Sequence, residues 1–166
     1  SGSSSGSGGP GWGTAVFTRP QEGIPWEFGD APAFSLSGPV ITEPRHHLYH
    51  GAERATNNTG EITAITEGLI WLREEAPGAK DTPAEIWYDS EYAAGEVTGR
   101  HKAHENKKLV GATRTIYGAA LSQRDIELKW VKGHFLNNGN EHADRLADQG
   151  KQGNVGQHSK RWTAPP

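Results

Sequence analysis

The chain has 166 residues, a formal net charge of −3 and no cysteine. This length suits one domain with its own hydrophobic core, and the lack of cysteine excludes a disulfide framework and a thiolate metal site. No apolar run approaches the roughly 18 residues that a membrane span needs, so we expect no membrane partner. The composition favours an intracellular protein of the cytoplasm or nucleus.

The N-terminal segment Ser1–Gly13 is rich in glycine and serine, as flexible linkers are. It runs directly into Trp12–Thr18, a β-rich segment, so it can equally be a native turn before a strand. A Pro- and Gly-rich turn region follows, and Ala33–Ile41 is then predicted to form a second strand. The chain has no methionine, and we therefore expect Ser1 to be a cropped, processed or engineered start.

The clearest helix in the sequence is Thr59–Ala76. Its apolar residues recur at steps of three and four positions, which is the period of one helix face; they are Ile62, Ile65, Leu69 and Leu72. Either Thr59 or Asn58 is predicted to cap its start, and the following Pro-Gly pair is predicted to stop it.

The second half of the chain alternates between strands and helices. Strands are predicted at 84–89 and 125–131, and helices at 90–97, 105–122 and 140–150. A hairpin followed by alternating elements predicts an α/β fold, with a mixed sheet and helices on its faces. We expect residues 1–150 to form the domain and residues 151–166 to form a polar, flexible tail.

Three acidic residues stand at positions where active sites form. Glu61 is in the first turn of the long helix, Asp89 ends a strand, and Asp144 is near the start of the last helix. Singly, such acids often only complement a helix dipole or cap a helix. Together they predict a metal site, because sites gather at the carboxyl ends of strands and converging carboxylates need cations. Oxygen ligands suit Mg²⁺ or Mn²⁺, and two such ions would promote phosphodiester cleavage.

His134 lies between a predicted strand end and the sequence Asn-Asn-Gly, which is predicted to be a mobile loop. A histidine in such a loop can take or deliver protons near neutral pH. The alternative is a surface histidine with no role, since the chain contains 8 histidines. We assign His46, His47 and His50 to this second class.

Three stretches of the chain resemble the main signatures of type 1 ribonuclease H. They are "ATNNTGEITAITEGL", "IWYDSEY" and "WVKGHFLNNGNEHADRLA". The resemblance runs from about Gly9 to Gly150, and the three stretches in this order are highly specific. It implies a mixed sheet, metal-dependent cleavage of the RNA strand in an RNA–DNA hybrid, and products with a 5′-phosphate.

The resemblance also implies roles for individual residues. Glu61, Asp89 and Asp144 match three of the family's four metal-binding carboxylates, which hold two Mg²⁺ or Mn²⁺ ions, and His134 matches a histidine that moves protons. Four further residues match positions that contact the hybrid, namely Asn57, Asn58, Ser90 and Asn140. Short polar side chains of this kind can recognise the 2′-hydroxyl that distinguishes RNA from DNA.

The chain departs from the family pattern at its start. The family's first, central strand ends in an aspartate before a Gly-Ser-type loop, and here Ser1 stands where that aspartate is expected. Three interpretations remain open: the chain begins just after the aspartate, the protein is an inactive form, or another segment replaces both strand and acid. A sheet without this strand would leave unpaired backbone groups on both neighbours.

A second departure is the weakly basic segment Gly99–Lys108, where some relatives carry a basic insertion rich in tryptophan. Few positive charges predict weak, salt-sensitive binding to the hybrid. We therefore expect a ribonuclease H, acting as a monomer or as part of a polyprotein. The alternatives are an inactive module that only binds hybrids and the ribonuclease H domain of a retroelement reverse transcriptase. A different nuclease or a transposase of the same fold is disfavoured by the motif spacing.

Overall fold

A computed structural model describes the chain at residues 11–16, 34–74, 76, 83–88, 91–99, 105–130, 137–153, 155 and 160–163. Within these residues the elements follow in the order β1 (Gly11–Val16), β2 (Phe34–Pro39), α1 (Asn57–Glu74), β3 (Ala84–Tyr88), α2 (Glu91–Thr98), α3 (Lys107–Leu121), β4 (Ile126–Trp130), α4 (Asn137–Lys151) and α5 (Lys160–Thr163). Every helix in the described part of the chain is too short or too polar to cross a bilayer.

The strands form two separate pairs. Strands β1 and β2 are antiparallel, with Trp12 opposite Gly38, and strands β3 and β4 are parallel, with Ile86 opposite Leu128. Within the described residues, each pair is a two-stranded sheet of its own. A hairpin followed by a parallel pair confirms the predicted mixed α/β architecture.

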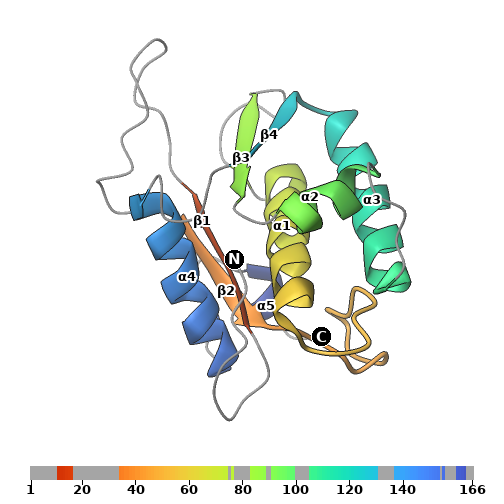
Figure 1. Cartoon of the computed structure of the whole chain (residues 1–166), viewed down its shortest axis with the longest axis vertical. Coiled ribbons are helices and arrows are strands. Elements are labelled where there is room, and N and C mark those ends of the chain that lie inside the picture. The colour runs from red at the N-terminus through yellow and green to blue at the C-terminus, as the bar shows by residue number, and fades with distance from the viewer. Residues whose placement is uncertain are drawn as a thin grey trace.

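The helices form layers on either side of the β1–β2 pair (Figure 1). Helix α4 covers one face of this pair, and α1 contacts β1 from the other side. Helix α3 packs against α1 on the side away from the β1–β2 pair, and α2 contacts both α1 and α3. Helix α1 is therefore the central element, and its buried residues run almost without interruption from Thr59 to Trp71.

Two apolar clusters meet at α1. One joins α1 to α2, α3 and β4, and its most deeply buried members are Ile62, Leu69 and Leu109. The other joins α1 to the hairpin and contains Trp12, Leu36, Ala64 and Trp71. Three residues of the apolar period that predicts this helix, Ile62, Ile65 and Leu69, belong to the first cluster, and Leu72 packs against both. Ala64 and Trp71 form a second buried face that the period does not mark.

Most predicted boundaries agree with the structure to within two residues, but α4 begins three residues early. The Asn-Asn-Gly stretch that we predicted to be a loop is the first turn of this helix, which starts at Asn137. A short strand, which the sequence suggests around Leu48 and Tyr49, is not formed in the described segment 40–56; these residues are irregular, and Leu48 is buried.

Candidate active site at the start of α1

The start of α1 is fixed by two threonines. The Thr59 backbone N–H donates to the Thr56 hydroxyl at 3.1 Å, and the Thr56 N–H donates to the Thr59 hydroxyl at 2.8 Å. The Thr59 hydroxyl in turn donates to the Thr56 carbonyl at 3.0 Å. This reciprocal arrangement is the geometry of a capping box, with threonine in place of the usual glutamate. It satisfies backbone groups that a helix start otherwise leaves unpaired.

The capping residue is therefore Thr56, and the predicted cap at Asn58 or Thr59 is wrong by two or three positions. A capping hydroxyl must come from the residue just before the helix to reach the N–H groups of the first turn. The spacing Thr-x-x-Thr was the signal for it in the sequence. Because Thr56 supplies the cap, the two asparagine side chains that follow are not needed for it.

Asn57 and Asn58 are exposed at this end of α1, whereas Glu61, one turn further along, is half-buried. The next residue, Ile62, is fully buried and anchors the turn in the core. The first turn of α1 thus presents two amides and a carboxylate at the rim of a rigid helix. Of the predicted site residues, the structure brings these three together.

The carboxyl ends of β3 and β4 lie side by side. Their register pairs Tyr88 with Trp130, the last residues of the two parallel strands. Asp89 follows Tyr88 in the sequence. Asp89, Ser90 and His134 lie outside the described residues, so their place at this edge remains a prediction.

Asn140 and Asp144 belong to α4, one turn apart, and their side chains also lie outside the described residues. The helix itself is placed by an unusually close contact with the hairpin. A β-carbon on Gly13 would lie 2.5 Å from the Ala147 nitrogen and 2.6 Å from the Ala143 carbonyl oxygen. Such distances are inside van der Waals contact, so β1 and α4 pack backbone against backbone.

The same contact extends along both elements. A β-carbon on Gly11 would collide with the backbone of Ala147 and Lys151, and one on Gly150 would collide with the backbone of Gly38. Sequence reasoning missed this role, because glycines at the end of a Gly-Ser segment are typical of a linker. The available signal was the presence of glycine at positions 11 and 13, because residues two positions apart lie on the same face of a strand.

The predicted metal ligands can be compared with the structure only at Glu61. Its carboxylate is a hard oxygen donor of the type that Mg²⁺ or Mn²⁺ prefers, and half-burial at a helix end suits a ligand. Among the described residues no group of three or more acidic or histidine side chains could hold a metal ion. The other two predicted ligands, Asp89 and Asp144, are not among the described side chains.

Comparisons with known proteins agree with this architecture. The sequence model of the RNase H family matches residues 2–152. A ribonuclease H of Saccharomyces cerevisiae is 32% identical over an alignment of 143 residues, and the match covers 74% of this chain and 38% of the yeast protein. A ribonuclease H of Rickettsia canadensis is 39% identical over 107 residues, covering 58% of this chain and 64% of that protein. A ribonuclease H of Saccharopolyspora erythraea is 32% identical over 125 residues, covering 68% of this chain and 77% of that protein.

Among solved structures, the chain is similar to the N-terminal RNase H domain of a Mycobacterium tuberculosis protein, determined as a fusion with maltose-binding protein. The TM-score is 0.55 with 23% identity, and the match covers 95% of this chain and 88% of that one. This likeness concerns the fold. The family match spans nearly the whole chain and every predicted site residue, and the chain therefore belongs to the RNase H family.

Proposed function

We propose that the chain is a metal-dependent endonuclease that cleaves the RNA strand of RNA–DNA hybrids. The observation that carries this proposal is the family match over residues 2–152, which includes every predicted site residue. The capped start of α1 supports it, because the helix holds two exposed amides next to a half-buried carboxylate. This combination suits a site that must bind a polar substrate beside a cation.

In this proposal Glu61, Asp89 and Asp144 hold two Mg²⁺ or Mn²⁺ ions. When bound, the ions supply the Lewis acidity for attack of water on the RNA phosphate and for departure of the 3′-oxygen. His134 delivers the proton that the departing oxygen needs to leave as a 3′-hydroxyl, as a histidine can near neutral pH. The products are an RNA end with a 3′-hydroxyl and one with a 5′-phosphate.

The hybrid is recognised by short polar side chains. Asn57 and Asn58 are exposed at the end of a helix whose other turns are buried, so they can contact ribose and base edges without rearrangement. Ser90 and Asn140 are proposed to contact the RNA strand nearby. A 2′-hydroxyl both donates and accepts hydrogen bonds, and an amide or hydroxyl side chain can satisfy it.

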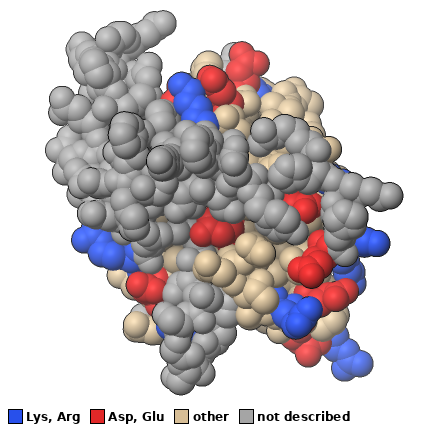
Figure 2. Space-filling view, viewed as in Figure 1, with Lys and Arg blue, Asp and Glu red and all other residues tan. Residues whose placement is uncertain are grey.

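The charge of the surface predicts weak binding. Figure 2 shows acidic and basic side chains interspersed on the visible face. Over segment 41–56 and the start of α3, the exposed charged residues are Glu43, Arg45, Glu53, Arg54, Glu105, Lys107 and Lys108. Since the acids offset most of the bases, few phosphates would be neutralised, and affinity for the hybrid should fall with added salt along a shallow slope.

The proposal is tested by incubating the full chain with an end-labelled RNA–DNA hybrid and Mg²⁺ or Mn²⁺. We expect Glu61→Gln to lower kcat/KM by at least about 100-fold, since it removes a metal-binding charge, and Asp89→Asn to do the same. The matched control is Glu74→Gln, which makes the same change at the exposed far end of α1 and should leave cleavage unaltered. Equal cleavage by all four proteins would rule out the proposed site.

A second candidate function is that of a module that binds RNA–DNA hybrids through Asn57 and Asn58 without cutting them. It is favoured by the exposure of these two amides at the capped start of α1, because amide contacts with a hybrid need no metal ion. In the same experiment this alternative predicts that the hybrid stays uncut with either Mg²⁺ or Mn²⁺, and that the bound hybrid migrates more slowly in a native gel. Binding without cleavage by the wild-type chain, together with loss of this binding in Asn57→Ala, would support the binding module over the enzyme.

A further inference from the structure

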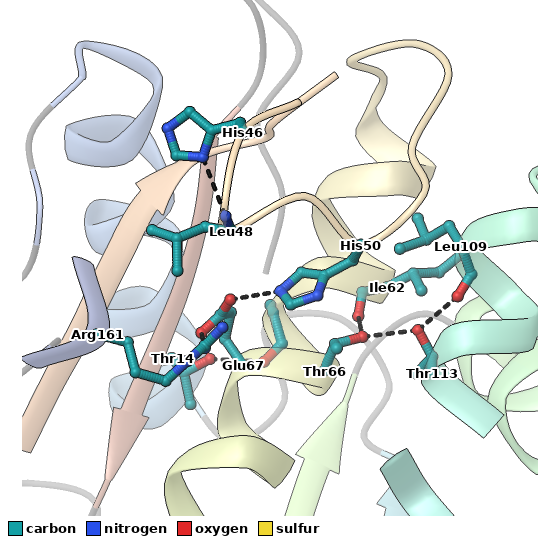
Figure 3. Close-up of polar contacts among 11 residues, drawn as sticks. Thr14, His46, Leu48, His50, Ile62, Thr66, Glu67, Leu109, Thr113 and Arg161 are labelled. Carbon is teal, nitrogen blue, oxygen red and sulfur yellow. Dashed lines mark hydrogen bonds and ion pairs between the residues drawn. The ribbon is translucent and has the colours of Figure 1, made fainter. Parts of the chain in front are cut away.

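Glu67 is a buried acid in the middle of α1, with only 5% of its side chain exposed. Its Oε1 lies 2.6 Å from His50 Nε2, and its Oε2 accepts a hydrogen bond from Arg161 Nη1 at 2.6 Å. Figure 3 shows the carboxylate held between these two side chains. Because a buried carboxylate is very unfavourable unless it is paired and hydrogen-bonded, these contacts explain how the core accommodates an acid here.

The two partners come from distant parts of the chain. His50 belongs to the irregular segment 40–56 that leads into α1, and Arg161 belongs to α5, 94 residues after Glu67. Helix α5 also lies beyond residue 152, where the family match ends. Glu67 therefore ties an element outside the family pattern to the segment that enters the proposed site.

A second contact of α5 is made by Trp162, which packs against the apolar cluster that joins α1 to the hairpin. The Trp162 ring packs 5.4 Å from the ring of Trp12, which is fully buried in β1. Within the described part of the chain, neither indole nitrogen has a hydrogen-bond partner, and unpaired buried donors weaken an interface. A helix of four residues also has no stability of its own. Docking of α5 should therefore depend strongly on the contact between Arg161 and Glu67.

The segment that contains His50 is held from two sides. On one side it lies against the start of α3, where a β-carbon on Gly51 (φ +115°) would be 2.8 Å from the Leu109 nitrogen and Lys108 Nζ lies 5.2 Å above the Tyr49 ring. On the other side His50 contacts Glu67. The segment then passes into the Thr56 cap and the two exposed asparagines. The last residue of the segment is Thr56, whose cap defines the start of α1 at Asn57.

We propose that Glu67 is a positioning residue for the hybrid-binding end of α1, and that α5 is a C-terminal latch that holds it in place. The expected effect on hybrid binding rests on the proposed function. The link from Arg161 through Glu67 to His50 rests on the contacts described above. Arg161 supplies the opposite charge and holds the carboxylate toward His50. His50 then fixes the segment that ends at Asn57, roughly 15 Å along α1 from Glu67 at 1.5 Å per residue.

The test compares Arg161→Gln with a matched control, Lys129→Gln, in the full chain. Lys129 also pairs with an acid, Glu85, at 3.2 Å, but in the β3–β4 pair. Two quantities are measured: amide hydrogen exchange at residues 48–60, and affinity for a labelled RNA–DNA hybrid in Ca²⁺, an ion whose flexible coordination suits binding rather than cleavage. Arg161→Lys is included because Arg161 uses one nitrogen on Glu67, which a lysine can replace.

We expect Arg161→Gln to speed exchange at residues 48–60 about tenfold and to weaken hybrid binding about fivefold, the lower end for coupled sites. Lys129→Gln should do neither, and Arg161→Lys should restore most of both. The proposal would be overturned if Arg161→Gln exchanged faster only at residues 160–163. In that case exchange at residues 48–60 and affinity for the hybrid would be the same as in Lys129→Gln. If the wild-type chain binds no hybrid, the proposed function fails together with the positioning role, while exchange at residues 48–60 still decides whether the latch exists.

Discussion

Helices α4 and α1 both carry predicted site residues, but they are attached to their neighbours in different ways. Helix α4 meets β1 backbone to backbone, because Gly11 and Gly13 have no side chain to separate them. Helix α1 meets α3 through side chains, among them Ile62 and Leu109 in the shared core. The α4–β1 contact requires residues without a side chain, whereas the α1–α3 contact requires apolar side chains of suitable volume.

The α1–α3 contact also contains a buried polar pair. The hydroxyls of Thr66 and Thr113 lie 2.8 Å apart, and each is also 2.8 Å from the carbonyl four residues earlier, on Ile62 and Leu109 (Figure 3). Two hydroxyl protons cannot serve three contacts at once, so one of the three always lacks a proton. This pair can therefore be changed with modest loss, whereas the glycine contact cannot.

The largest effect is expected from Gly13→Ala. Its methyl group would meet the Ala147 nitrogen and the Leu146 side chain at 2.5 Å, and relieving such overlap should lower the free energy of unfolding by about 3 kcal/mol. Urea denaturation followed by circular dichroism measures this. A Gly13→Ala protein as stable as the wild type would show that β1 and α4 are not in backbone contact.

A smaller effect is expected at the threonine pair. Thr66→Val or Thr113→Val alone should lower the free energy of unfolding by about 1 kcal/mol, because the remaining buried hydroxyl loses a partner. The double variant should cost less than the sum of the two, since either single change already removes the contact between the two hydroxyls. A double-mutant cycle in urea measures the coupling, and strict additivity would contradict the hydrogen bond between them.

The smallest effect, of opposite sign, is expected from Gly118→Ala on α3. Among the described residues, no atom beyond the surrounding backbone of α3 lies within 4 Å of the β-carbon that this change adds. Alanine is favoured over glycine inside a helix by about 0.5–1 kcal/mol. The free energy of unfolding should rise by that amount in the same urea measurement. A loss of stability would mean that α3 packs more closely at Gly118 than the structure shows. Gly118 could then not serve as the open position with which the tightly packed Gly13 is compared.

Predictions from local pattern succeeded where a feature depends on neighbours in the sequence. The apolar spacing of α1 located the helix to within two residues at either end, because Ile62, Ile65 and Leu69, which carry this spacing, are all buried in the core. It did not reveal that α1 is buried on a second face as well. The start of α4 was misplaced since Asn-Asn-Gly is typical of a loop, whereas the structure continues the helix through it from Asn137. The glycine contacts that seat α4 on the hairpin begin at Ala143, so they lie further along the helix than this first turn.

The histidines illustrate the same limit of local pattern. His46 and His47 are exposed and stacked on each other with ring centroids 4.8 Å apart, as expected for surface residues. His50, which the sequence assigns to the same class, instead contacts the buried carboxylate of Glu67. Nothing in the spacing of three nearby histidines distinguishes them, because the acid that does so lies in the next helix.

By itself the sequence determined the family and the order of the elements, and it predicted the residues of an RNase H site, since these depend on short motifs and on the period of apolar residues. Only the tertiary structure decided that Glu67 joins His50 to Arg161 and that glycine backbones seat α4 on β1. Both features connect segments far apart in the chain. Their free energy comes from burial and close approach in the folded protein, which no local pattern encodes.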